Sequence, residues 1–210
     1  MPVDGQKEYT LGEGAYSAAL TKAHFLFSEM RITAALLAGG QPSDAAMERI
    51  VRENLYQYPT ERSLKDVAKY CLSRLAGMGS PELVAALATA PASVAKQVCL
   101  YAMAKQSRLV HDFLMTVIAE KYRCLDYSFS SKDVTVFFER LREQDPAVSG
   151  WSASTVKKLQ GVVTRALVEC GYIDTCRSKV LNIVSPAPVL EQVIRAKHED
   201  SLLRAFHVFS

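Results

Sequence analysis

Trp151–Ser185 reads WSASTVKKLQGVVTRALVECGYIDTCRSKVLNIVS, and the pattern of these residues is the strongest indication of the protein's architecture. Its first half has the pattern of an amphipathic helix, because Ser152 is a favoured N-cap residue and apolar side chains follow at helical spacing. The apolar positions are Val156, Leu159, Val163 and Leu167. A glycine at position 171 suits a left-handed C-cap. The sequence therefore predicts a helix that is capped by Ser152 and ends at Cys170–Gly171.

The residues after this helix indicate a β-hairpin. Tyr172–Asp174 and Val180–Val184 carry aromatic and β-branched side chains that favour strands, and Thr175–Lys179 connects them. A helix followed by a basic hairpin is the plan of a winged helix-turn-helix. We therefore expect a mainly helical, all-α fold with one short β-hairpin wing, in which helix-turn-helix and winged helix-turn-helix elements surround a central helical bundle.

The outer face of the predicted helix is small, polar and basic. At about 100° per residue, the side opposite the apolar stripe carries Ser154, Lys158, Gly161 and Arg165, with Lys157 and Thr164 on its flanks. Small residues permit a close approach to the major groove, and Lys or Arg can reach phosphates and guanine edges. Arg177 and Lys179 at the hairpin tip are placed to reach the neighbouring backbone. The competing interpretation is a surface helix whose lysines only interact with water, since charged outer faces are usual.

Composition and charge are those of an ordinary globular protein. The chain has 210 residues, of which 49% are hydrophobic and 22% charged, which excludes a disordered or fibrous class. The net charge is only +3, and residues 146–185 contain five basic and two acidic residues, so this segment holds an excess equal to that of the whole chain. This is a modest electrostatic footprint for a nucleic-acid-binding protein.

Sequence signatures of cofactor, metal and catalytic sites are missing. The five cysteines form no CxxC pair, and the closest two, Cys170 and Cys176, have no nearby histidine, so we expect a reducing compartment and no metal site. Neither GxxxxGK[ST] nor a GxGxxG after a strand occurs. We therefore expect no enzymatic activity, no cofactor and no small-molecule substrate.

The hydropathy pattern predicts no membrane span. The longest uncharged apolar candidate, Leu83–Ala95, is interrupted by Pro91 and is shorter than the ~20 residues that a span requires. The first residues do not resemble a secretory signal. The expected location is the cytoplasm.

Gly and Pro residues that interrupt helices divide the chain into five parts. We expect a loose N-terminal arm (1–17), an N-terminal helix-turn-helix-like unit (18–79), the central helical bundle (80–128), the winged helix-turn-helix (129–185) and a C-terminal helix (186–210). The first helix should run from about 18 to 38. Helices are also predicted at 83–90, 93–106 and 109–123, and another should begin at residue 130 or 131.

The N-terminal unit offers a second basic surface. Its third predicted helix follows the N-cap candidate Thr60 and presents Arg62, Lys65 and Lys69 on its outer side. Three helices joined by short turns form a helix-turn-helix-like unit, so these residues are a second candidate for contact with DNA. The alternative is a solvated face that nearby acidic residues partly neutralise.

Four segments of the chain resemble the BrxA family, whose members are small proteins of bacterial BREX phage-exclusion systems. These segments are HFLFSEMR at 24–31, ENLYQY at 53–58, FFER at 137–140 and WSASTVKKL at 151–159. They occur in the family's order and with similar spacing, and the resemblance covers about residues 22 to 186.

The resemblance implies an all-helical protein with helix-turn-helix elements and one hairpin wing. It further implies binding of double-stranded DNA without catalysis, in host defence beside a methyltransferase and other BREX components. Two alternatives remain open: an adaptor that docks a larger BREX enzyme, with the basic patch incidental, and, more weakly, an RNA-binding protein.

Overall fold

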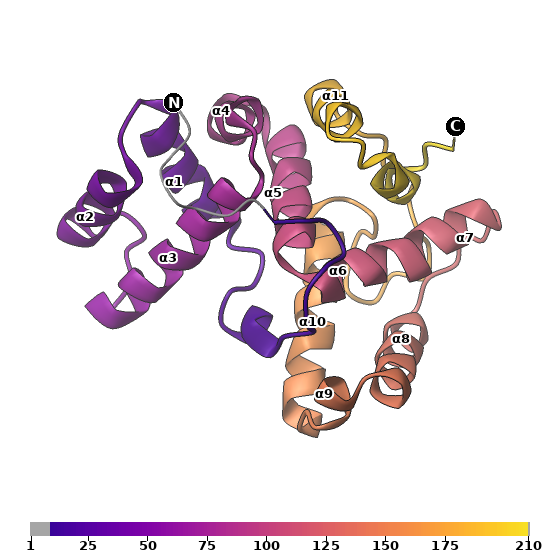
Figure 1. The fold of residues 1–210 in the computed structure, drawn as a ribbon. Coiled ribbons are helices and arrows are strands. Elements are labelled where there is room, and N and C mark those ends of the chain that lie inside the picture. Colours follow the sequence, from indigo (N-terminus) through magenta and orange to yellow (C-terminus); the bar gives the residue numbers. More distant parts are fainter. Residues whose placement is uncertain (1–8, 210) are drawn as a thin grey trace. The chain divides into compact units, whose positions relative to one another are not determined.

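The chain folds into two compact units of helices (Figure 1). The computed structural model describes residues 9–209. Unit 1 contains Phe25–Gln106 and the described residues up to Thr10, whereas unit 2 contains Leu11–His24 and everything from Ser107 onward. The main segment of unit 1 is therefore inserted, in sequence, into unit 2.

Unit 1 is a bundle of helices that bury their apolar side chains against one another, and residues 98–105 are buried all round. Its helices are α1 (Phe27–Ala38), α2 (Ser43–Glu53), α3 (Glu61–Gly77), α4 (Pro81–Thr89) and α5 (Ala92–Gln106). Helix α1 packs against α3 and α4, and α5 packs against α3 and α4. The N-caps Thr60 and Ser80 accept hydrogen bonds from the backbone N–H groups three residues later, which starts α3 and α4.

A buried arginine joins the two ends of the inserted segment. Arg74 of α3 is fully buried, and it donates from Nε to Gln106 Oε1 at 2.8 Å and from Nη1 to the Phe25 carbonyl at 3.4 Å. Burial lowers the pKa of Arg74. These hydrogen bonds hold the first and last residues of the segment 25–106 to the core of unit 1.

The prediction of one helix from 18 to 38 is wrong. A short 3-10 helix, η1 (Ala18–Thr21), belongs to unit 2, and α1 of unit 1 begins only at Phe27. Between them Leu26 has a left-handed backbone with φ of 53°, and the Phe25 carbonyl accepts hydrogen bonds from Arg74 and from the thiol of Cys99. The carbonyl is thus satisfied by the core rather than by a further helical turn.

The predicted loose arm lies partly outside the described residues, namely at 1–8. Within the described part, Tyr9 is held on α3: its backbone N–H donates to the Gly77 carbonyl at 3.2 Å, and its hydroxyl lies 2.6 Å from Ser73 Oγ. Its ring occupies the space that a side chain at Gly77 would need.

Unit 2 contains a long helical run and a set of shorter helices. The run is α6 (Arg108–Phe113), the π-helical stretch η2 (Leu114–Ala119) and α7 (Glu120–Arg123), as predicted for 109–123 apart from its π-helical middle. There follow α8 (Ser131–Gln144), α9 (Pro146–Ser149), α10 (Ala153–Glu169), α11 (Pro188–Ala196) and η3 (Asp200–Phe206). The predicted C-terminal helix is thus split in two, and His198, with φ of 56°, lies at the break.

Helix α10 is supported on two sides within unit 2. It packs against α8 and against η1. Phe137 and Phe138 of α8 are buried, and Phe137 meets the ring of Phe113 edge-to-face with centroids 5.1 Å apart. A capping box between Ser130 and Asp133 starts α8. Helices α8 and η1 therefore both pack on α10, while its outer face stays exposed.

The predicted hairpin between 172–174 and 180–184 is not confirmed, because the described residues contain no regular strand. Their single β-bridge joins Ser128 and Val180 in antiparallel orientation. Between the two predicted strands, the backbone of Asn182 donates to the Tyr172 carbonyl at 2.8 Å, whereas its side chain donates to Gly171 O at 3.1 Å and to Asp174 Oδ1 at 2.9 Å. Side-chain hydrogen bonds thus occupy the region where further ladder bonds were expected.

Candidate nucleic-acid interface

Both ends of α10 are defined by local hydrogen bonds. Ser152 Oγ accepts from the backbone N–H of Thr155 at 3.2 Å, as predicted for the N-cap. At the other end Gly171 has φ of 79°, and the N–H of Tyr172 donates to Leu167 O at 2.9 Å. This 6→1 hydrogen bond, together with that from Gly171 to Val168, is a Schellman motif. The predicted bounds and both caps are confirmed.

The two faces of α10 differ as the spacing predicted. The inner face buries Val156, Leu159, Val163, Ala166 and Leu167. The outer face exposes Ser154, Lys157, Lys158, Gly161 and Arg165. The helix thus presents three cations and two small residues on one exposed side.

The basic side chains of this outer face are available to contact a ligand. No ion pair of Lys157, Lys158 or Arg165 is formed within residues 9–209. A Cβ added at Gly161 would meet no atom within 4 Å, so the surface is open there. The hydroxyl of Thr164 is turned to its own helix and donates to Gln160 O at 2.8 Å.

The segment after α10 places two further cations on a hydrogen-bonded turn. Ser178 N donates to Thr175 O at 3.0 Å, and Thr175 N donates to Ser178 Oγ at 2.9 Å. Arg177 and Lys179 lie on this turn, exposed, and neither has an ion pair in the described part of the chain. The Lys179 carbonyl accepts from Phe129 N at 3.0 Å, which ties the turn to the segment before α8.

The second basic set lies in the other unit. Arg62, Lys65 and Lys69 are exposed on α3 of unit 1. Lys65 forms an ion pair with Glu61, one turn earlier, and this hydrogen-bonded contact lowers the pKa of Glu61. One cation of this set is therefore partly neutralised, in contrast to those on α10.

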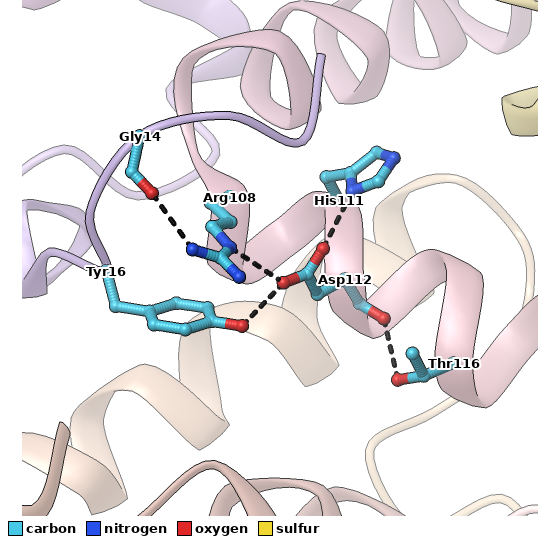
Figure 2. A network of polar contacts seen from close by, with 6 residues as sticks. All are labelled: Gly14, Tyr16, Arg108, His111, Asp112 and Thr116. Atoms are coloured by element: carbon cyan, nitrogen blue, oxygen red, sulfur yellow. Dashed lines mark hydrogen bonds and ion pairs between the residues drawn. The ribbon is translucent and has the colours of Figure 1, made fainter. Parts of the chain in front are cut away.

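A network that the sequence reasoning missed lies in unit 2, where Asp112 accepts from three side chains. Asp112 Oδ2 lies 2.6 Å from Tyr16 Oη and 3.2 Å from Arg108 Nε, and Asp112 Oδ1 lies 2.8 Å from His111 Nδ1. Figure 2 draws these contacts. Arg108 also lies over the Tyr16 ring, 4.5 Å from its centroid, and donates to the Gly14 carbonyl at 3.3 Å. These contacts fasten the chain segment before η1 to α6.

The network changes the proton affinities of its members. Burial and the hydrogen bond to Asp112 raise the pKa of Tyr16 to about 12. Burial alone would raise the pKa of Asp112, but hydrogen bonds from His111 and Tyr16 outweigh burial and leave that pKa below its usual range. The Arg108–Asp112 spacing of four residues was the one available sequence signal, whereas Tyr16 lies where the sequence shows no periodicity.

Two further findings on the described residues concern metal binding and membrane insertion. Among residues 9–209 no cluster of three or more His, Cys, Asp or Glu side chains is placed to hold a metal ion. In the same part of the chain, no helix combines the length and apolar character needed to cross a bilayer.

Comparison with known proteins gives a consistent result. The BrxA family matches residues 14–198. A protein of Paramagnetospirillum magneticum named "BREX protein BrxA" is 30% identical over 198 residues, which cover 94% of this chain and 99% of the relative. A protein of the same name from Bacillus cereus is 29% identical over 161 residues, which cover 77% and 80% of the two chains.

A solved structure has the same fold. The crystal structure of an uncharacterized protein from Magnetospirillum magneticum superposes with a TM-score of 0.77 at 28% sequence identity, and the match covers 92% of this chain and 98% of that one. Because the family match spans most of the chain and the relatives agree in name, the protein belongs to the BrxA family of BREX phage-defence systems.

Proposed function

We propose that this BrxA-family protein binds double-stranded DNA, without catalysis of its own, through the outer face of α10. The observation that carries the proposal is the exposed, unpaired basic face beside an open glycine position. Lys158 and Arg165 would contact phosphates or guanine edges, while Ser154 and Gly161 permit close approach to the groove. As a BREX component in the cytoplasm, such a protein would act beside other proteins of the system.

The surroundings of α10 support a winged helix-turn-helix interpretation. Helix α8 precedes α10 and packs against it, which suits the first helix of such a motif. After α10 the chain returns to pair with the segment before α8 through Ser128 and Val180. Arg177 and Lys179, on the turn within this return, would reach the DNA backbone beside the groove.

The salt dependence of DNA binding tests this proposal. Four to six phosphate contacts give a slope of roughly −4 to −5 for log K against log[salt] with duplex DNA. The cations of α10 and the following turn supply most of them. Fluorescence anisotropy of a labelled duplex at several salt concentrations measures the slope directly, and a flat response would favour an adaptor role.

A charge-reversal pair tests the surface itself. The double variant Lys158→Glu/Arg165→Glu should weaken binding to every duplex sequence and reduce the salt slope by about one for each lost contact. Stability should change by no more than about 0.5 kcal/mol per substitution, because both side chains are exposed. Arg142→Glu, an exposed reversal on α8, is the control for each of the two reversals made singly.

Two comparisons separate the remaining alternatives. If Arg62→Glu/Lys65→Glu abolished DNA binding while Lys158→Glu/Arg165→Glu left it intact, the DNA-binding surface would be that of α3, which also includes Lys69. Duplex RNA as a competitor separates DNA from RNA binding, because the narrow major groove of A-form RNA excludes a helix. The second candidate function, an adaptor for another BREX protein, is favoured by one surface of unit 2, which is described next.

A further inference from the structure

An open groove in unit 2 lies apart from the basic face of α10. It runs between α8 and the run α6–η2–α7, and its volume is about 720 Å³. Its apolar lining includes Val117, Val136, Phe137 and Leu141. Val136 is 42% exposed, which is high for an aliphatic side chain in the middle of a helix that packs against a core. The tyrosine and carboxylate of the Tyr16–Asp112 pair also line the groove.

The carboxylates that line this groove are all paired within the protein. Asp112 is paired with Arg108 at 3.2 Å, and Asp126 and Asp133 share Lys121 at 2.8 Å and 2.9 Å. Glu120 is paired with Arg123 at 2.6 Å. Four carboxylates thus share three cations, and the uncompensated negative charge lies at Asp126 and Asp133.

Two cations of the groove are not compensated. Lys132 and Arg140 line it from α8, both are exposed, and neither has an ion pair within the described residues. Together with Val136 they form a series with a spacing of four residues, so the three side chains lie on one face of α8. The two charges are about 12 Å apart along the helix axis, at 1.5 Å per residue.

The opposite wall contains the π-helical stretch Leu114–Ala119. Segments of this type are rare and occur frequently at functional sites. Two of its residues, Thr116 and Val117, line the groove, and the Thr116 hydroxyl donates to the Asp112 carbonyl at 2.7 Å. The groove thus combines an apolar lining with two separated positive charges and an unusual backbone.

We propose that this groove binds a peptide segment of a partner protein that carries two carboxylates with an apolar side chain between them. The carboxylates pair with Lys132 and Arg140, and the apolar side chain packs on Val136 and Phe137. A nucleic acid fits less well, because its continuous line of phosphates would meet Asp126 and Asp133, which share the single cation Lys121. A peptide can carry its two carboxylates opposite Lys132 and Arg140 alone. The proposal goes beyond DNA binding and assigns a second surface.

A random twelve-residue peptide library displayed on phage and selected against the full chain tests this. The expected result is enrichment of acidic peptides with apolar residues between the acids. A synthetic, fluorescein-labelled copy of an enriched peptide should bind Lys132→Glu/Arg140→Glu at least about tenfold more weakly than the wild-type chain. Arg142→Glu, an exposed reversal on α8 that does not line the groove, should keep the affinity within about twofold.

Three outcomes would overturn the proposal. The first is no enrichment, or enrichment of basic peptides. The second is equal binding of the enriched peptide by the wild type and by Lys132→Glu/Arg140→Glu. The third is a loss of duplex DNA binding by this variant without any effect on peptide binding, since the groove would then face phosphates. If the α10 variants leave duplex DNA binding unchanged, the result with the peptide still holds. The two proposals can therefore fail independently.

Discussion

Gly161 allows a test in which stability and binding change in opposite directions. It lies in the middle of the 17-residue helix α10, is exposed, and has no atom within 4 Å of the position of an added Cβ. Replacing a helical glycine by alanine stabilises a helix by about 0.8–1.0 kcal/mol when nothing clashes. For a chain of this size the Tm of Gly161→Ala should rise by about 2–4 °C.

Binding to DNA should respond in the opposite sense if Gly161 faces the groove. Gly161→Gln keeps most of the helix-propensity gain but adds a long neutral side chain, so affinity for a duplex should fall by at least about tenfold, which is about 1.4 kcal/mol. Differential scanning calorimetry and duplex anisotropy measure both quantities on the same samples. A more stable Gln variant with unchanged affinity would refute the assignment of this face to DNA.

Three further perturbations test the framework that supports this helix. Val163→Asp buries a carboxylate at a position that is 3% exposed and should lower the free energy of unfolding in urea by about 3–5 kcal/mol; a small loss would contradict the packing of α10. Tyr16→Phe removes the hydrogen bond to Asp112 and should cost about 1.5 kcal/mol at pH 7. Folding lowers the pKa of Asp112, so the stability that its carboxylate contributes is complete above the unfolded-chain pKa near 3.9. This stability is lost as pH falls through the lower pKa of the folded state. The difference in unfolding free energy between Tyr16→Phe and wild type should therefore shrink in acid. Gly12→Ala should destabilise by about 1–3 kcal/mol, because Gly12 has φ of 75° and an added Cβ would lie 2.7 Å from the His111 ring; unchanged unfolding would show that the segment before η1 is not fastened to α6.

Helix α10 could be predicted closely because its signals are local. Ser152, the apolar spacing and Gly171 lie within the helix or directly beside it, and each has a short-range physical effect. The same holds for α8, whose start at Ser131 follows a capping box. The exposure of Lys158 and Arg165 follows from the same periodicity.

Features that depend on distant residues were not predictable from the local pattern. The break before α1 depends on hydrogen bonds from Arg74 and Cys99 to the Phe25 carbonyl, at separations of 49 and 74 residues. Likewise Tyr16 finds Asp112 across 96 residues. Regular strands are absent where the hairpin was predicted, and there the side chain of Asn182 donates to Gly171 O and to Asp174 Oδ1. The proposed DNA contacts on α10 stay predictions.

The insertion of one unit into the other has a consequence for synthesis on the ribosome. Unit 1 is complete once Gln106 has emerged, so it can fold while the rest is still being translated. The segment Leu11–His24 has by then been made, yet α10, against which its helix η1 packs, has not. The side chains of Leu20 and Ala23, which are buried in the folded protein, therefore stay exposed until the residues from Ser107 to α10 have been synthesised. A fragment that starts at Ser107 would have the opposite defect, since its α10 would lack η1 and would leave apolar surface uncovered.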